Sequence, residues 1–327
     1  MKNKKIKKTN IVVIAVLTFS VIFMTYLGVN TEDIKQIILG EDVLGNLTQN
    51  TVDTKNSDEI EEKSDNLKVY FIDVGQGDSI LIEKSGKYAL VDAGPNSSED
   101  KLVSYIKSLG IEKFTYIFGT HAHEDHIGGM DKIIKNFNFD NIIFPNTSAN
   151  TITFEKFIDS IISKGKKIEE AKSGVVYNLD DVKIEVLSPE PLVKYDNQNN
   201  YSIVLKVTYG KVSYLLMGDA ENLIETSLIN NNKNLSADVL KVGHHGSTTS
   251  TSAKFLDDVS PKYAVICVGE NNDYGHPKEA ILKRLSIRNI QVFRTDINGT
   301  IISESDGNNI KFTVEKGESK WSTLLIE

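Results

Sequence analysis

The sequence predicts an α/β fold for the part of the chain that begins near residue 67. Short runs rich in β-branched residues, bounded by Gly, Asp and Asn, have the length and the flanks of strands. Apolar residues at helical spacing lie between several of these runs, so helices and strands alternate. From residue 67 onward the chain has about 260 residues, enough for one sizeable core.

The predicted strands share a composition of Val, Ile, Leu and Tyr. They include KVYFID (68–73), SILIE (79–83), YALVDAG (88–94), VKIEVLS (182–188), SIVLKVTYG (202–210) and VSYLLMG (212–218). Two segments instead have the apolar spacing of a helix. One contains Phe154, Phe157, Ile158, Ile161 and Ile162 and stops at Gly165. The other spans 99–109, with Ser98 as the expected N-cap and Leu102, Val103, Ile106 and Leu109 on its buried face.

The N-terminal part has a different composition. MKNKKIKK carries five lysines, and the nineteen residues of Ile11–Val29 carry no charge. A helix of that length spans roughly 28 Å, close to the hydrocarbon thickness of a bilayer. We expect a cytoplasmic basic segment at 1–10 and a transmembrane signal anchor at 11–29, with the rest of the chain outside. The alternative is a cleaved signal peptide and a secreted protein.

The remaining divisions follow from charge. Residues 30–66 hold ten Asp and Glu against three Lys, so we expect an acidic tether there, then one folded domain at 67–315 and a tail at 316–327. The domain is acidic, which argues against tight passive binding of nucleic acid but not against an enzyme that releases its product. Cys267 is the single cysteine, so it forms no intramolecular disulfide, and its apolar flanks predict that it packs in the core.

The six histidines fall in three short motifs. THAHEDHIGG (120–129) contains three, KVGHHGST (241–248) contains two, and DYGHPKEA (273–280) contains one. In an extended segment, His121 and His123 project from the same side. Imidazole and carboxylate together suit zinc, manganese or iron. A solvated polar loop is the alternative, but it leaves the density of metal-seeking groups unexplained.

These motifs resemble a known family. HxHxDH after FTYIFGT, with YALVDAG upstream and LLMGDAE downstream, resembles the metallo-β-lactamase superfamily. FIDVGQGDSILI, DVLKVGHHGSTTSTSAKFL, YAVICVGENNDYGHP and FRTDINGTI resemble the C-terminal hydrolase domain of ComEC-family DNA-uptake proteins. The resemblance runs from about Leu67 to about Val314. It implies a metallo-β-lactamase-like αββα sandwich with the site along one edge.

The resemblance also implies roles for individual residues. The metal-ligand candidates are His121, His123, Asp125, His126, the bridging Asp219, and one of His244 and His245. Only one of that last pair is expected to ligate, because adjacent strand residues point to opposite faces. The catalytic candidates are Asp92, as a carboxylate that fixes the HxHxDH loop, and His276, as a group that protonates the leaving oxygen or contacts phosphate. Their alternatives are a turn aspartate and a structural loop histidine.

One departure from the family bears on the metal. Two-metal members use a further mid-chain histidine, but none lies between His126 and His244. The corresponding segment, DNQNNYSI, offers Asn199, Asn200, Ser202 or water. Oxygen in place of nitrogen favours a harder ion. We expect one or two divalent ions per chain, Mn²⁺ or Zn²⁺, with the site of Asp125, His126 and Asp219 the more complete.

Together these features predict a membrane-tethered, extracytoplasmic, metal-dependent hydrolase, a phosphodiesterase or nuclease acting on DNA. Its expected partners are DNA or another phosphodiester and, through the N-terminal helix, the membrane. The alternatives are a metallohydrolase of a cell-wall phosphodiester, lactam or thioester, and a non-catalytic surface binding module. The GSTTSTS run (246–252) leads to a helix start near Ser252, which predicts either an anion site or simply an N-cap.

Overall fold

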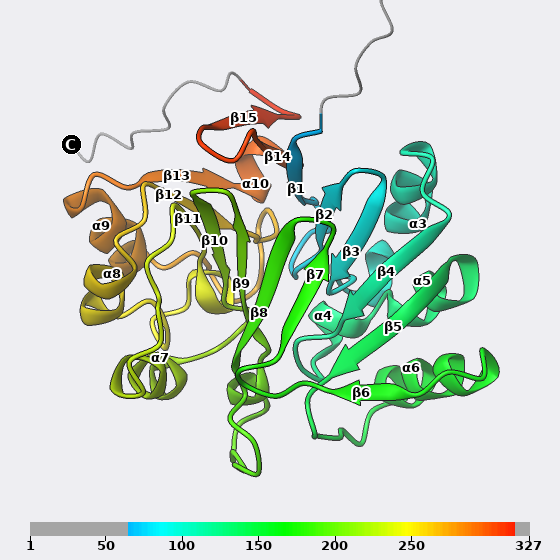
Figure 1. Ribbon diagram of the computed structural model, residues 1–327. Coiled ribbons are helices and arrows are strands. Elements are labelled where there is room, and N and C mark those ends of the chain that lie inside the picture. The colour runs from blue at the N-terminus through cyan, green and yellow to red at the C-terminus, as the bar shows by residue number, and fades with distance from the viewer. Residues whose placement is uncertain (1–64, 318–327) are drawn as a thin grey trace, which may run out of the picture. The chain divides into compact units, whose positions relative to one another are not determined.

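Two β-sheets packed face to face, with helices covering their outer faces, make up the computed structural model, which describes residues 65–317 (Figure 1). Helices α3, α5 and α6 cover the first sheet, and α7, α8 and α9 cover the second. The predicted αββα sandwich is therefore confirmed.

The first sheet has eight strands. In spatial order they are β15 (Ile310–Val314), β14 (Ile301–Ser305), β1 (Leu67–Phe71), β2 (Ile80–Lys84), β3 (Lys87–Val91), β4 (Lys113–Phe118), β5 (Asn138–Phe144) and β6 (Ile168–Glu170). The second sheet has seven strands, in the order β13 (Gln291–Arg294), β12 (Tyr263–Ile266), β11 (Val239–Lys241), β10 (Val212–Leu216), β9 (Val204–Tyr209), β8 (Val182–Ser188) and β7 (Val176–Leu179). Each predicted run overlaps one of these strands, and β1, β2 and β3 each extend one residue beyond the run that predicted them.

The helices of the described residues are mostly short. They are α3 (Glu99–Ser108), α4 (Glu124–Ile127), α5 (Met130–Asn136), α6 (Ile152–Ser163), α7 (Asn222–Asn230), α8 (Ala253–Val259), α9 (Glu279–Ile287) and α10 (Thr295–Asn298), with 3-10 turns η1 (Asn96–Ser98), η2 (Gln198–Tyr201) and η3 (Gly243–Gly246). Both predicted helices are confirmed, as α3 and α6. Three residues differ from the predicted pattern. Leu109 and Ile162 are not buried but 36% and 67% exposed, because each lies at the end of its apolar stripe. Ser98 makes no capping hydrogen bond, because it ends η1 and its hydroxyl donates to the Pro95 carbonyl.

The central strands of each sheet are buried on both faces, which explains why they are apolar runs rather than alternating ones, whereas the edge strands β6 and β15 have no buried residue. In β1, Val69 and Phe71 face the second sheet, whereas Tyr70 faces the helices. This alternation follows from the two-residue period of a strand. Cys267 is a free thiol buried between the sheets, as its apolar flanks predicted.

The strand directions bring the polar loops to one edge of the sandwich. Strands β3 and β4 run parallel in the first sheet, and β10, β11 and β12 run parallel in the second. The carboxyl ends of parallel strands meet at the same edge, where α/β sheets bind ligands. The loops after these strands carry every histidine of the chain.

The loop after β1 packs directly against the HAHEDH loop. Gly77 has φ 142°, and a Cβ there would lie 2.2 Å from the Asp125 carbonyl oxygen. The neighbouring Asp78 N–H donates to the same oxygen at 3.2 Å. Glycine is required at this approach, since a side chain would separate the two loops.

No helix between residues 65 and 317 is both long and apolar enough to cross a membrane. The predicted span at 11–29 lies outside the described residues, as do the basic segment before it and nearly all of the tether and the tail. Within the described part, the first strand begins at Leu67 and the last ends at Val314.

Candidate metal centre

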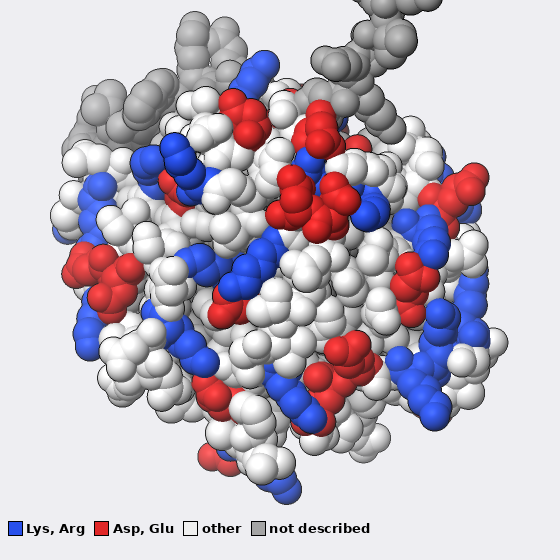
Figure 2. Space-filling model, in the orientation of Figure 1, with Lys and Arg blue, Asp and Glu red and all other residues white. Residues whose placement is uncertain are grey.

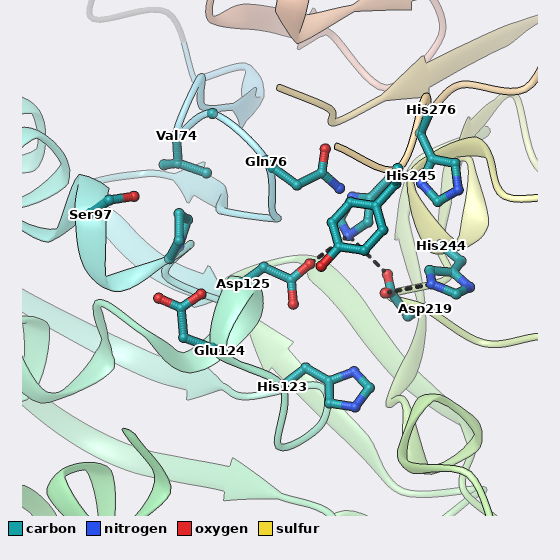
Figure 3. A pocket seen from close by; sticks show the side chains of 13 residues that line it. Val74, Gln76, Ser97, His123, Glu124, Asp125, Asp219, His244, His245 and His276 are labelled. Carbon is teal, nitrogen blue, oxygen red and sulfur yellow. Dashed lines mark ion pairs between the residues drawn. The ribbon is translucent and has the colours of Figure 1, made fainter. Parts of the chain in front are cut away.

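A pocket of about 540 Å³ lies where the loops after β1, β4, β10, β11 and β12 meet. Its lining residues are Val74, Gly75, Gln76, Pro95, Ser97, His123, Glu124, Asp125, Asp219, His244, His245, Tyr274 and His276. Asp125, Asp219, His244 and His245 point toward one another, and Val74, Ser97 and Glu124 lie across from His276 (Figure 3). Residues from both sheets therefore share one cavity.

Four side chains at the base of the pocket form the tightest cluster. One ligand atom from each of Asp125, His126, Asp219 and His245 lies within 4.8 Å of the other three. His126 Nε2 lies 3.2 Å from Asp219 Oδ1, and His245 Nε2 lies 3.4 Å from the same oxygen and 3.2 Å from Asp125 Oδ2. Two imidazoles and two carboxylates are a donor set that zinc or manganese accepts.

The hydrogen bonds around the cluster leave the inner atoms free. His126 Nδ1 lies 2.7 Å from Asp92 Oδ2, and His245 Nδ1 lies 2.8 Å from the Cys267 carbonyl oxygen. Both partners are acceptors, so each Nδ1 carries the proton, and in the neutral ring each Nε2 presents a lone pair. His126 Nε2, His245 Nε2 and Asp219 Oδ1 are buried and make no hydrogen bond. Buried polar atoms are rarely unpaired, so this cluster fits a divalent ion.

The charges of the cluster are strongly coupled. Burial disfavours the charged form of both imidazoles, but the nearby carboxylates, Asp219 foremost, raise the pKa of His126 well above its usual value and that of His245 to about 10. Conversely, burial disfavours the ionised Asp219, yet His245 and His126 hold its pKa well below the ordinary range. Without an ion, protons therefore compensate the carboxylates, and a bound ion would displace them.

His121 and His123 form a second, adjacent group. His121 Nε2 lies 3.0 Å from His123 Nδ1, so the spacing of HxH does place both rings on one side. The Thr120 hydroxyl lies 2.7 Å from Asp92 Oδ2 and 3.1 Å from His121 Nδ1. Because that hydroxyl donates to the carboxylate, it accepts from His121 Nδ1–H and leaves Nε2 as the lone-pair nitrogen. Burial lowers the pKa of both rings.

The segment without a mid-chain histidine forms η2. Asn199 Oδ1 is buried there without a hydrogen-bond partner. The Asn199 amide nitrogen lies 3.5 Å from His244 Nε2, and His244 Nε2 lies 3.7 Å from Asp219 Oδ2. His244 Nε2 thus lies near both the Asn199 amide group and Asp219. Among the described residues, however, His121 and His123 belong to no cluster as tight as that of Asp125, His126, Asp219 and His245.

The strand argument for His244 and His245 was wrong. Strand β11 ends at Lys241, and both histidines lie in η3 with left-handed backbone, φ 49° and 51°. Side chains do not alternate in that conformation, so both rings line the pocket. Only His245 joins the tight cluster, while His244 Nδ1 lies 3.0 Å from Thr249 Oγ1.

Asp92 is buried behind the site rather than in the pocket. Its carboxylate accepts from the Thr120 N–H and hydroxyl, each at 2.7 Å, and contacts His126 Nδ1. Its φ of 61° is also that of a turn residue. Asp92 therefore has the features of a turn aspartate as well as those of a carboxylate that holds the HxHxDH loop. Asp92 acts through Thr120 and His126, which makes it a positioning residue.

His276 lies on the pocket wall near His244, with ring centroids 5.8 Å apart. Burial and the neighbouring His244 lower the pKa of His276 to about 4, so its ring is neutral near pH 7. Tyr274, which is 63% exposed, stacks on the His276 ring at 5.7 Å. The wall therefore offers an aromatic face together with a neutral imidazole.

The GSTTSTS run holds no open anion site. The Glu225 carboxylate accepts from the N–H groups of Thr251 and Ser252, and Ser252 Oγ accepts from the Phe255 N–H. The N-cap alternative is confirmed. The anion alternative is wrong, because a carboxylate of this chain already occupies the position.

Three polar residues beside the site were not singled out from the sequence: Asp78, Lys241 and Glu225 are all buried. A charged residue inside an apolar strand, as Lys241 is in DVLKVG, is a signal that could have been used. Glu225 lies in a helix, where a charged residue is usual at the surface, so the sequence gave no such signal.

Comparison with known proteins places this geometry in a family. A sequence profile described as Metallo-beta-lactamase superfamily matches residues 72–270. The chain is 36% identical to ComE operon protein 3 of Bacillus subtilis over 253 residues, which are 72% of this chain and 32% of that protein. It is 31% identical to competence protein ComA of Neisseria gonorrhoeae over 231 residues, 70% of this chain and 31% of that protein. The chain thus matches about a third of the length of these relatives.

A solved structure supports the fold. The metallo-beta-lactamase fold protein YhfI from Bacillus subtilis aligns over 74% of this chain and 100% of its own, with a TM-score of 0.51 and 14% identity. At that identity the likeness concerns the arrangement of the sheets and helices alone.

The geometry separates the roles of the adjacent histidines. We expect His245→Ala to remove a ligand from the tight cluster and weaken ion binding by at least tenfold, because His245 Nε2 faces both Asp125 and Asp219. His244→Ala is the matched control and should retain the tightly held ion. Metal content after dialysis measures both. Equal loss in the two variants would contradict the assignment.

Proposed function

The chain belongs to the metallo-β-lactamase superfamily, and on that premise we propose that it is a metal-dependent phosphodiesterase or nuclease that cleaves DNA. The observation that carries the proposal is the cluster of Asp125, His126, Asp219 and His245, whose inner atoms are buried and unpaired beside an open pocket. A divalent ion held there supplies Lewis-acid chemistry, activating water and stabilising negative charge on phosphate oxygens.

The chain's own residues provide the remaining functions. Asp92 orients His126, and the Cys267 carbonyl orients His245, so the ligand nitrogens are held in position before substrate arrives. His276 is proposed to contact the leaving oxygen. Its ring is neutral in the free protein, and an anionic substrate beside it would favour the protonated form that can donate.

The pocket wall supports a nucleotide substrate. Tyr274 presents an exposed ring at the pocket, and nucleobases stack on such rings with a gain of roughly 1–3 kcal/mol per base. Lys, Arg, Asp and Glu are interspersed on the face shown in Figure 2. Such a surface holds nucleic acid loosely, so recognition is proposed to depend on the pocket. The chain is similar to competence protein ComA, and its motifs resemble those of the ComEC family of DNA-uptake proteins. This similarity also favours DNA as the substrate.

The test is cleavage of labelled single-stranded DNA by the purified chain, run beside a bis-aryl phosphodiester, a lactam and a thioester. We expect metal-dependent cleavage of both phosphodiesters and none of the other two substrates, because the site is built to stabilise charge on phosphate oxygens.

The matched control is Asp219→Ala. The Asp219 carboxylate faces both His126 and His245, with its other oxygen toward His244. Its removal should abolish hydrolysis and retention of the ion together, by at least a hundredfold in rate. Full activity in this variant, or hydrolysis of the lactam or thioester alone, would overturn the proposal.

The proposed metal is manganese, with one ion held tightly and a second held weakly. The tight cluster has equal numbers of imidazole and carboxylate groups, and the mid-chain segment contains oxygen-bearing side chains such as Asn199 but no histidine. Oxygen ligands favour the harder ion. The chain, stripped by chelator, should regain more phosphodiesterase activity with Mn²⁺ than with stoichiometric Zn²⁺. Two tightly bound zinc ions with maximal activity would contradict this.

We further propose that residues 11–29 anchor the chain in the membrane and that the hydrolase domain is extracytoplasmic. The support is the uncharged run after five lysines. Protease added to cells stripped of their outer barriers should digest the domain and spare a cytoplasmic marker, while the chain resists extraction at alkaline pH. Protection of the domain would contradict the topology, and recovery from the medium would indicate cleavage and secretion.

A further inference from the structure

A buried ion pair lies behind the candidate metal centre. Lys241, at the end of β11, is 0% exposed, and its Nζ lies 2.5 Å from Asp78 Oδ2. The same nitrogen lies 3.4 Å from the carbonyl oxygen of Gly218, the residue before Asp219. Burial disfavours the ammonium, but the Asp78 carboxylate raises the pKa of Lys241 above its usual value. Lys241 therefore keeps its charge inside the protein, in contact with the Asp78 carboxyl group.

Asp78 contacts two of the loops that supply the tight cluster, those of Asp125 and His245, and also the loop after β3. Its backbone N–H donates to the Asp125 carbonyl, and its own carbonyl accepts from the Gly94 N–H at 2.8 Å. Its Oδ1 is buried without a hydrogen bond and lies 3.4 Å from His245 Nδ1. That nitrogen already donates to the Cys267 carbonyl at 2.8 Å. The carboxylate thus lies beside the outer edge of a ring whose inner nitrogen faces Asp125 and Asp219.

We propose that Asp78 and Lys241 are positioning residues for His245, with the Asp78 carboxylate making its imidazole a stronger metal ligand and Lys241 holding that carboxylate beside the ring. The inference rests on the metal site of the proposed function but not on the substrate. Asp92 contacts His126 Nδ1 directly at 2.7 Å, whereas Asp78 lies 3.4 Å from His245 Nδ1 and acts on that ring through its charge, because the nitrogen donates to the Cys267 carbonyl.

The charge of the pair requires an explanation beyond holding loops together. Both backbone contacts of Asp78 would persist with any side chain. Replacing a buried ion pair by apolar or neutral groups of similar shape is often neutral or stabilising for a fold. A carboxylate behind a ligating histidine, in contrast, typically contributes 10–100-fold in metal affinity. The electrostatic effect of Asp78 on His245 is the explanation we offer for the buried charges of Asp78 and Lys241.

The experiment compares the full chain with the double variant Asp78→Asn, Lys241→Met, which removes both charges at nearly constant shape. The Kd for Mn²⁺ is measured by chelator competition without substrate, and the visible absorption of the Co²⁺-loaded proteins is recorded. We expect a folded double variant whose Kd is about 10–100-fold higher, with an altered Co²⁺ spectrum. A folded double variant with an unchanged Kd would overturn the inference.

Two further variants keep the test decisive. Lys84→Met is the matched control, because Lys84 is also 0% exposed and pairs with Asp65 at 2.9 Å, among residues that do not line the pocket. It should change thermal stability but not the Kd. If the double variant does not fold, Asp78→Asn alone is judged by the same criterion. Absence of metal binding in the unmodified chain would defeat the proposed function instead, so the two failures are distinguishable.

Discussion

This structure depends on burying several carboxylates close together at one edge of the sandwich. Asp78, Asp92 and Asp219 are each at most 2% exposed, and Asp125 lies against them through His126 and His245. Taking one such charge out of water costs several kcal/mol even after relaxation. The fold tolerates this concentration only because positive charge is supplied on every side, by Lys241, by the imidazoles and, in the loaded protein, by an ion.

That constraint explains the architecture of the edge. In a sandwich with helices on both outer faces, polar groups can gather at the ends of the strands without entering the core. Parallel strands then bring loops from distant parts of the sequence to the same point. Glycine at position 77 permits two of these loops to touch, so that Asp78 and Asp125 share a backbone hydrogen bond. The carboxylates converge because the backbones beneath them do.

Apolar periodicity predicted the strands and helices, while the resemblance of the motifs to a known family implied the sandwich and most of the residues at its edge. Apolar periodicity identifies strands and helices directly, and HxHxDH is dense enough in ligands to identify a site by itself. The backbone of η3 was beyond such reasoning, because the left-handed conformation of His244 and His245 depends on contacts across the fold. Asp78 was missed for the same reason, because only its contact with the distant Lys241 makes it noteworthy. Lys241 did give a signal, as a charged residue inside an apolar strand.

The two histidine groups are unequal in a way that bears on chemistry. His126 and His245 each have an outer acceptor that fixes the proton on Nδ1, and carboxylates face their inner nitrogens. His121 and His123 face each other instead, and their supporting contacts are hydroxyls. Carboxylates attract a cation more strongly than hydroxyls do, and the burial that lowers the pKa of His121 and His123 leaves those rings neutral. The group of His126 and His245 is therefore the one that would hold an ion in the free protein. An ion beside His121 and His123 would be better stabilised once an anionic substrate, such as the proposed phosphodiester, added its own oxygens.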